Sequence, residues 1–459
     1  MELVNKLLTK LSAPQKIALS FVLVILLGTL LLMLPITNRS GIGLNALDAL
    51  FTATSATCVT GLVTVTTMEQ FNILGHIVIM CLIQVGGLGL MTIAAVFVIQ
   101  VKNRLSLNEK MAMKEMLNQD SLFDMHRFIR NIIKYTFIFE GIGAILFMIR
   151  FIPEFGLVQG IFNSLFTAVS AFCNAGFDTY SFNSLVPYVN DPLINFTVMA
   201  LIILGGLGFA VWFDLKLKVS QMKGKSISLH RLWKSLSLHT KIVLIMTLVL
   251  IIVPAILILM IEYNNPETIG NLNFLEKTMA SLFQSVTLRT AGFASINMGA
   301  LRQGTEFLMI ICMFIGGSPG GTAGGVKTTT IALVLLVVLS QLKKGDEVVV
   351  FKRSINPHVL IRSVTIVTIN LVTLLTGIFI LTITEQQPFI HIVFEAVSAM
   401  ATVGLSANLT PLLSIMGKLV IITLMFVGRI GIMTLLISMI KGKSSVKAVA
   451  YPNGNVIVG

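Results

Sequence analysis

The sequence predicts an all-α, polytopic membrane protein built from four repeats around one axis. Three observations support this fold class. The chain has 459 residues, of which 55% are hydrophobic and only 12% charged. Several of its apolar runs reach about 18 residues or more, enough to span a bilayer. Its basic residues occupy separate clusters, and one glycine motif recurs four times.

The basic clusters predict the orientation of the chain in the membrane. Lysine and arginine, which give a net charge of +13, gather at the N-terminus and in residues 102–134, 216–241, 343–362 and 441–447. The segments between these clusters carry glutamates and few bases. This alternation follows the positive-inside rule, so we expect both termini and three basic loops to be cytoplasmic. Membrane topology explains the positive charge better than nucleic-acid binding does. The first apolar run, near 17–34, is followed by no small-residue cleavage site, so we expect a retained helix.

Each repeat is expected to contain a first span, a half-helix, a glycine and a second span. The first spans are predicted near 17–35, 129–150, 240–262 and 359–383. Half-helices of about a dozen residues, too short to cross a bilayer, are predicted near 46–57, 160–172, 276–288 and 389–400. The second spans are predicted near 72–100, 192–214, 304–341 and 416–440, which gives eight spans. The predicted repeats are 1–110, 111–222, 223–345 and 346–459.

One glycine follows each half-helix at nearly constant spacing. Gly61, Gly176, Gly292 and Gly404 are separated by 115, 116 and 112 residues. Phenylalanine, alanine and serine precede three of them at matching positions, and the third copy is one residue shorter. Close helix packing would explain a single such glycine, but four in register favour a shared structural role.

Non-helical backbone at membrane depth is tolerated only where it is buried in protein or lines a watery cavity. Four such stretches around an axis can form a ring of carbonyl oxygens that replaces the hydration shell of a monovalent cation. Half-helices that point their C-terminal ends inward would further favour a cation. The repeats therefore predict a pseudo-fourfold central pore with a cation filter.

The four filter segments resemble those of the Trk/Ktr/HKT superfamily of potassium transporters. They read Thr57-Cys58-Val59-Thr60-Gly61, Cys173-Asn174-Ala175-Gly176, Leu288-Arg289-Thr290-Ala291-Gly292 and Ala401-Thr402-Val403-Gly404. The length and compact plan are most similar to the Ktr-type membrane subunit. The residues expected to bind potassium are Val59, Thr60, Gly61, Asn174, Ala175, Gly176, Thr290, Ala291, Gly292, Thr402, Val403 and Gly404. Only the fourth segment has the Thr-Val-Gly core of ordinary potassium channels, which leaves the strictness of selection against sodium open.

A second glycine motif lies 24 to 29 residues after each filter glycine, beginning at Gly86, Gly205, Gly316 and Gly428. The third copy expands to six glycines and a proline in residues 316–325, which cannot continue a helix. We expect this stretch to line the conduction path rather than to serve as a flexible linker. The resemblance implies that it is an intramembrane gating loop.

In the fourth copy Arg429 replaces a glycine. An unpaired arginine at mid-membrane is costly, so we expect it to bind free carbonyls of the broken third-repeat helix; reaching the interface is the alternative. The predicted gate comprises Gly316, Gly317, Ser318, Gly320, Gly321, Gly324, Gly325, Lys327 and Arg429. Lys327 is expected to steer the loop or snorkel. The glycine stretch nearly mimics a phosphate loop, but its lysine is one residue late and no strand precedes it, so we reject nucleotide binding there.

Four further residues allow more than one interpretation. Asp178 fits a cation-concentrating charge at the outer mouth and an exposed loop charge equally well. Asp48 is expected to cap the first half-helix. Glu395 is expected to be a buried polar brace or a vestibule charge. Arg289 is expected to point away from the axis and tie its half-helix to the wall.

Together these features predict potassium uptake without covalent chemistry, and not an enzyme. No disulfide framework, zinc motif or catalytic constellation is found. Potassium is the expected substrate, and the chain itself needs no cofactor. The resemblance implies a bacterial plasma-membrane protein, a homodimer, a cytoplasmic ring of nucleotide-binding RCK-type regulatory subunits, and sodium as an activator. The alternative is a sodium-permeable relative; glycine at position 61 favours potassium, whereas serine there marks sodium-preferring plant relatives.

Overall fold

A computed structural model describes residues 12–89, 125–222, 228–343 and 347–439. Apart from one short hairpin, β1 (Val349–Val350) and β2 (Arg353–Ser354), the regular structure of these residues is helical. The first helix of each repeat is long and apolar enough to cross a membrane. These helices are α2 (Ala13–Leu32), α8 (Met125–Phe155), α13 (Leu238–Glu262) and α17 (Pro357–Thr384). Their positions agree with the predicted first spans.

Each first helix is followed by a shorter helix, which we call a pore helix. The four pore helices are α3 (Ala46–Thr57), α9 (Leu157–Cys173), α14 (Phe274–Thr287) and α18 (Phe389–Met400). They lie within a few residues of the predicted half-helices. The remaining short elements are η1 (Pro35–Thr37), α4 (Thr67–Gln70), η2 (Val186–Tyr188), α12 (Leu229–Ser235), η3 (Met298–Ala300) and η4 (Thr410–Leu412).

In the first, second and fourth repeats the second helix ends or breaks at the second glycine motif, where the sequence predicted a continuous span. In the first repeat, residues 90–100 of the predicted span lie outside the described residues. The second helices are α5 (Ile73–Leu88), α10 (Pro192–Gly206) with α11 (Phe209–Gln221), α15 (Gln303–Phe314) with α16 (Thr328–Leu342), and α19 (Ile415–Ile430) with α20 (Ile432–Met439). The sequence predicted a break in the third repeat only. Gly89, Gly208 and Gly431 have φ angles of 81°, 89° and 87°, a left-handed conformation that ends a helix. In the second repeat the two halves meet at 92°.

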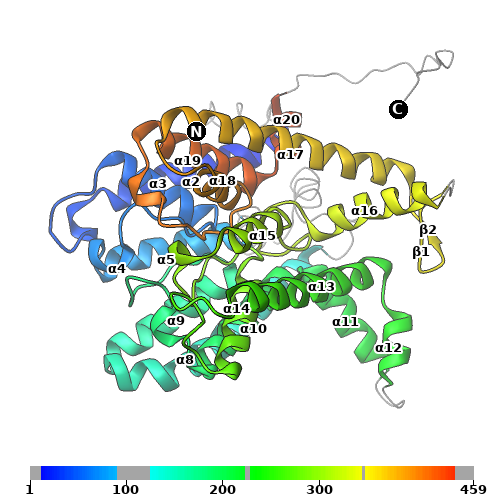
Figure 1. The fold of residues 1–459 in the computed structure, drawn as a ribbon, viewed down its shortest axis with the longest axis horizontal. Helices are drawn as coiled ribbons and strands as arrows, with labels where there is room; N and C mark the ends of the chain where they lie inside the picture. Colours follow the sequence, from blue (N-terminus) through cyan, green and yellow to red (C-terminus); the bar gives the residue numbers. More distant parts are fainter. Residues whose placement is uncertain (1–11, 90–124, 223–227, 344–346, 440–459) are drawn as a thin grey trace.

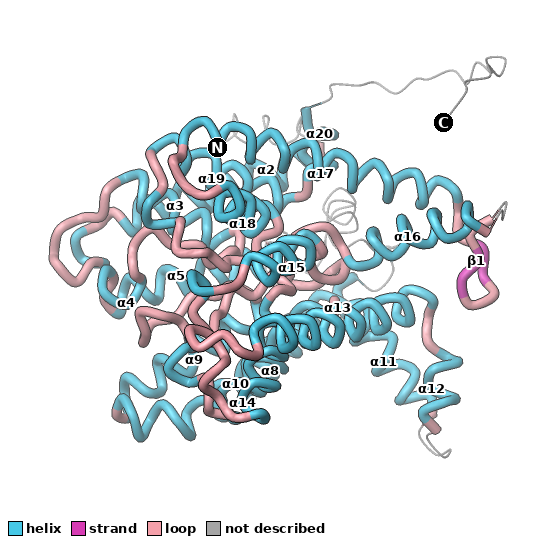
Figure 2. Tube along the Cα trace, in the orientation of Figure 1, coloured by secondary structure: helices cyan, strands magenta, loops and turns pink. Residues whose placement is uncertain are grey.

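The repeats close into a ring through one recurring contact. The second helix of each repeat packs on the pore helix of the next: α5 on α9, α10 on α14, α15 on α18, and α19 on α3. In Figure 1 the repeats accordingly follow one another around the molecule, from blue through cyan and green to orange. Figure 2 shows loop backbone gathered inside this ring, enclosed by helices.

Side-chain caps fix where the pore helices of the first and third repeats begin. The Asn45 side chain accepts from the Leu47 N–H and caps α3, so the expectation that Asp48 caps this helix is wrong. Asp48 lies in the first turn, where its carboxylate pairs with Lys418 Nζ at 2.7 Å. Because Lys418 belongs to α19, this pair joins the fourth repeat to the first. In the third repeat Asn273 and Glu276 form a reciprocal capping box on α14.

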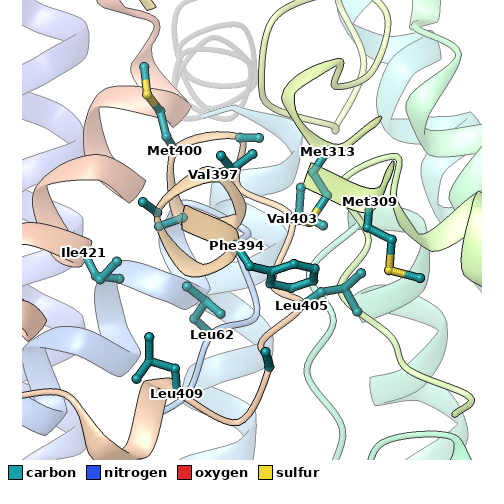
Figure 3. Close-up of a cluster of buried hydrophobic side chains, with 14 of the residues drawn as sticks. Leu62, Met309, Met313, Phe394, Val397, Met400, Val403, Leu405, Leu409 and Ile421 are labelled. Atoms are coloured by element: carbon teal, nitrogen blue, oxygen red, sulfur yellow. The ribbon is translucent and has the colours of Figure 1, made fainter. Parts of the chain in front are cut away.

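The pore helices are largely buried, whereas aliphatic side chains of the first helices are exposed on the outside. Figure 3 shows Phe394 of α18 beside Leu62 and Leu405, with Met309 and Met313 of α15 on the neighbouring helix. On the first helices, by contrast, many leucines and isoleucines are exposed, for example Leu30 at 64%. An apolar exterior of this kind suits contact with lipid tails.

In the first, second and fourth repeats the second glycine motif brings the second helix against the pore helix of its own repeat. A Cβ atom on Gly86, Gly205 or Gly428 would overlap the carbonyl oxygen of Thr57, Phe172 or Met400, which lies at the end of that pore helix. The missing side chains therefore allow an approach that no other residue permits.

We expect Gly205→Ala to lower the thermal stability of the purified protein, because its Cβ atom collides with rigid backbone. Overpacking of this kind costs about 1–3 kcal/mol. Gly141→Ala is the matched control, since a Cβ atom there meets nothing within 4 Å. The two variants are heated in detergent, and the loss of the monodisperse species gives the midpoint temperature of unfolding for each. Equal midpoints would show that the contact at Gly205 does not constrain the packing.

Candidate ion-conduction pathway

The four filter segments share one unusual backbone conformation. Two residues before each filter glycine, Val59, Asn174, Thr290 and Thr402 have φ angles of 57°, 62°, 63° and 52°. The filter glycines themselves have φ angles of 99°, 70°, 79° and 93°. Left-handed backbone is costly for residues with a side chain, above all for a β-branched one. The same strain at four equivalent positions indicates that the surrounding fold imposes it.

The filter glycines form a closed ring with carbonyl groups of the neighbouring repeats. A Cβ atom on Gly61 would lie 2.5 Å from the oxygen of Ala175, and one on Gly176 would lie 2.7 Å from that of Ala291. A Cβ atom on Gly292 would lie 2.6 Å from the oxygen of Val403. Gly404 closes the ring against the oxygen of Thr60. Each glycine thus leaves room for the carbonyl of the residue before the next glycine.

Hydroxyl groups of the pore helices hold the filter segments in place. The Oγ atoms of Ser55 and Ser398 accept from the N–H groups of Gly61 and Gly404, at 3.0 and 3.1 Å. In the second and third repeats, Ser170 Oγ and Thr287 Oγ1 each donate to the carbonyl that follows the glycine, at 2.7 Å. The serines recurred in the sequence motif, but no role was predicted for them.

The sequence reasoning also missed the four residues that directly follow the filter glycines. Leu62, Phe177, Phe293 and Leu405 are all buried, with at most 1% exposure. They anchor the exit of each filter segment in the core. Their regular position, one residue after each glycine, is a signal that could have identified them.

A vestibule opens on the side of the filter that follows the glycines. It consists of two adjoining cavities of about 510 and 520 Å³ that share Gly61, Gly176, Gly404 and Asp178 among their lining residues. Asp178 therefore lies at the mouth of the filter, which supports the cation-concentrating interpretation over an exposed loop charge. Loss of hydration raises the pKa of its carboxyl to about 7, opposed by a hydrogen bond from the Ser181 backbone.

The predicted gating loop, residues 316–325, is an ordered structure seated against the second repeat. Its ends are joined by the pairing of Ile315 with Val326. The N–H groups of Ser318 and Thr322 donate to the carbonyls of Gly206 and Gly205, at 3.0 and 3.1 Å. Thr322 Oγ1 also donates to the carbonyl of Phe172 at 3.0 Å. These bonds are inconsistent with a flexible linker.

Arg429 reaches from the fourth repeat to the loop and to the first repeat. Its guanidinium donates to the carbonyl of Thr322, which is the kind of partner that the sequence predicted. It also donates to the carbonyls of Gly86, at 2.5 Å, and Gly87, at 3.3 Å, which the sequence did not predict. A cavity of about 200 Å³ lies here, lined by Arg429, Lys327 and glycines of the loop and second helices. Lys327 Nζ donates to the carbonyl of Ala323 at 2.7 Å and so braces the loop from within.

The structure also places the two remaining charged residues. Glu395 is completely buried and accepts a hydrogen bond from Thr410, which fits a polar brace and not a vestibule charge. Arg289 is buried, but its guanidinium nitrogens have no hydrogen-bond partner among the described residues. The expectation that its side chain ties α14 to the wall is therefore wrong. Only its backbone makes a link, because its carbonyl accepts from Asn174 Nδ2 at 3.1 Å.

Behind the second filter segment lies a buried carboxylate that the sequence reasoning missed. Glu140 of α8 accepts from Gln84 Nε2 at 3.3 Å and contacts Cys173 Sγ at 3.9 Å. The second filter segment thus contacts Glu140 through Cys173 and the backbone of Arg289 through Asn174. The available signal was the single acidic residue within the span predicted at 129–150.

Comparison with known proteins identifies the family. The family model TrkH, described as a cation transport protein, matches residues 11–450. Ktr system potassium uptake protein B of Bacillus subtilis (strain 168) is 42% identical over 450 residues, which cover 98% of this chain and 97% of that protein. Potassium/sodium uptake protein NtpJ of Enterococcus hirae is 40% identical over 455 residues, 98% of each chain.

The fold has a counterpart among solved structures. The crystal structure of the potassium transporter TrkH from Vibrio parahaemolyticus superposes with a TM-score of 0.70 and 18% identity, over 92% of this chain and 85% of that one. This likeness shows the shared four-repeat membrane fold. With the family match over nearly the whole length, it follows that the chain is a multi-pass membrane protein of the TrkH family of cation transport proteins.

Proposed function

We propose that this chain takes up potassium ions across the bacterial plasma membrane, through a filter formed by the four glycine segments. The observation that carries the proposal is the closed ring in which each filter glycine faces a carbonyl of the next repeat. Such a ring offers fixed oxygen ligands to a dehydrated monovalent cation. The names of relatives with about 40% identity, two of them potassium uptake proteins, support the choice of ion.

The proposed gate is the loop of residues 316–325 together with Lys327 and Arg429. Arg429 spans the space between this loop and the first repeat, and a small cavity lies beside it. The loop would have to leave its seat on the second repeat for ions to pass below the filter.

Sodium permeation is the second candidate function. One relative is named as a potassium/sodium uptake protein and is 40% identical. Three of the four filter segments also lack the Thr-Val-Gly core. The ring of glycines at positions 61, 176, 292 and 404 favours potassium, because none carries a side chain that would narrow the ring.

The assembly is proposed as a homodimer with an RCK-type nucleotide-binding ring on its cytoplasmic side, and with sodium as an activator. The name "Ktr system" of several relatives supports a multi-component assembly. The basic segments, which by the positive-inside rule face the cytoplasm together with both termini, supply a surface for such a ring. The proposed boundaries of the four repeats are 1–110, 111–222, 223–345 and 346–459.

Replacement of the first filter glycine tests the pore. We expect Gly61→Ser to lose potassium preference, because its Cβ atom would press on the carbonyl of Ala175 and displace a filter ligand. Rubidium uptake at low external potassium, in a bacterial strain without its own potassium systems, is measured with and without competing sodium.

Gly304→Ser is the matched control, since a Cβ atom there has only one neighbour, at 3.9 Å. A membrane-inserted Gly61→Ser protein with unchanged potassium preference would exclude the proposed filter. If the wild type shows no uptake on its own, the same rubidium uptake is measured with a candidate ring subunit co-expressed.

The proposed role of Asp178 predicts a pH dependence. Because the pKa of this carboxyl is raised to about 7, it is charged above that pH and becomes protonated as the outer pH falls through 7. Uptake at low potassium should therefore fall between about pH 8 and pH 6, and Asp178→Asn should flatten the profile at the low-pH level. Glu69→Gln removes the other carboxylate of the first vestibule cavity and should leave the profile unchanged. Proteoliposome flux at fixed inner pH gives the measurement, and a wild-type profile retained by Asp178→Asn would rule the role out.

The gate hypothesis predicts that Arg429→Ala raises basal flux several-fold, because the loop loses its bond to the guanidinium through Thr322. Arg429→Lys keeps the charge but not the fork of donors, so its basal flux should lie between those of the wild type and Arg429→Ala. Rubidium flux into proteoliposomes without any regulatory subunit measures basal activity. Correctly inserted Arg429→Ala protein with equal or lower flux would count against the gate.

A further inference from the structure

The third repeat differs from the others at the position three residues before the filter glycine. This position is occupied by Cys58, Cys173 and Ala401 in the first, second and fourth repeats, and by Arg289 in the third. All four residues are buried, with at most 4% exposure. A ring of otherwise similar segments therefore contains one fixed positive charge.

The side chain of Arg289 ends at the junction between the second and third repeats. A Cβ atom on Gly206 would lie 4.0 Å from Arg289 Nη2, 3.5 Å from Asn174 Nδ2 and 3.8 Å from Ala323 Cβ. The guanidinium is thus close to the second filter segment and to the proposed gating loop. Among the described residues, none of its three nitrogens has a hydrogen-bond partner and no carboxylate pairs with it. Glu140, the buried acid near the second filter segment, contacts Gln84 and Cys173 and forms no ion pair with Arg289.

Arg289 also lies at the C-terminal end of a pore helix, two residues after Thr287, where α14 ends. The C-terminal end of a helix carries roughly −0.5 elementary charge, so four pore helices present about −2 to the filter. One guanidinium offsets about half of this. The net attraction that the pore helices exert on a cation is thereby reduced but retained.

We propose that Arg289 sets the preference of the filter for monovalent over divalent cations. This proposal rests on the proposed conduction of cations through the filter. The energy of an ion in a fixed electrostatic field scales with its charge, so a divalent ion is disfavoured by the guanidinium twice as strongly as potassium. Without Arg289 the full field of the pore helices would hold a divalent ion of similar size, such as Ba²⁺, and block the pore.

Substitution of Arg289 tests the proposal through Ba²⁺ inhibition of rubidium flux in proteoliposomes. Arg289→Met removes the charge at similar volume, and it should lower the half-inhibitory Ba²⁺ concentration by about tenfold or more. Arg289→Lys keeps the charge and should stay within about threefold of the wild type. Arg302→Met, which removes an exposed arginine of the same repeat, is the control for a general change of charge and should behave as the wild type.

Two results would overturn the proposed role of Arg289. Inserted Arg289→Met protein with wild-type Ba²⁺ sensitivity would overturn the proposal, as would an equal gain of sensitivity in Arg289→Lys. Replacing an unpaired buried charge by an apolar residue removes a desolvation cost and should not destabilise the protein. If Arg289→Met does not insert, Arg289→Gln, which also removes the charge, is measured in its place and must meet the same expectation. Rubidium flux of the wild type without Ba²⁺ tests the conduction function separately.

Discussion

The contact between each filter glycine and the preceding carbonyl of the next repeat is the constraint on which the rest of this fold depends. It requires four backbone segments to meet with less space than one methyl group between them. Left-handed residues such as Val59 and Thr402 supply the necessary bend, and pore-helix hydroxyls such as Ser55 Oγ hold it. The short pore helices, the tight glycine contacts behind them and the ring order of the repeats all bring these segments together.

The symmetry of this ring is broken on the side of the filter where the second helices break. The third repeat has a long glycine loop in place of a simple helix break, and the fourth has Arg429 in place of a glycine. These two departures are in direct contact through Thr322. Arg289, also in the third repeat, adds a charge behind the filter. A fourfold frame fixes ligand positions, whereas control of passage needs only one moving element, so departures confined to two repeats leave the ring intact.

The sequence predicted the features that depend on composition and spacing, and it missed those that depend on distant contacts. Pore helices are short apolar runs followed by glycine, so their positions were predicted within a few residues. The break at Gly208 was missed because hydropathy continues across it, from α10 into α11. The bond from Arg429 to Gly86 joins residues 343 positions apart, and no local pattern indicates it. That the Arg289 guanidinium has no hydrogen-bond partner in the described part of the chain is equally a property of the assembled repeats.

The hydrogen bonds of Arg429 also set a lower limit on the free energy that any regulator of the proposed gate must supply. A hydrogen bond to a charged group contributes about 1.5–3 kcal/mol, and Arg429 donates three, of which one goes to the loop. Moving a two-state element from mostly closed to mostly open needs about 5.5 kcal/mol of differential binding. Loss of the Thr322 bond alone is therefore too small for full opening, since the loop also has its bonds to Gly205, Gly206 and Phe172. A cytoplasmic regulator would have to act on the broken second helices as well, because their ends carry both Arg429 and the seat of the loop.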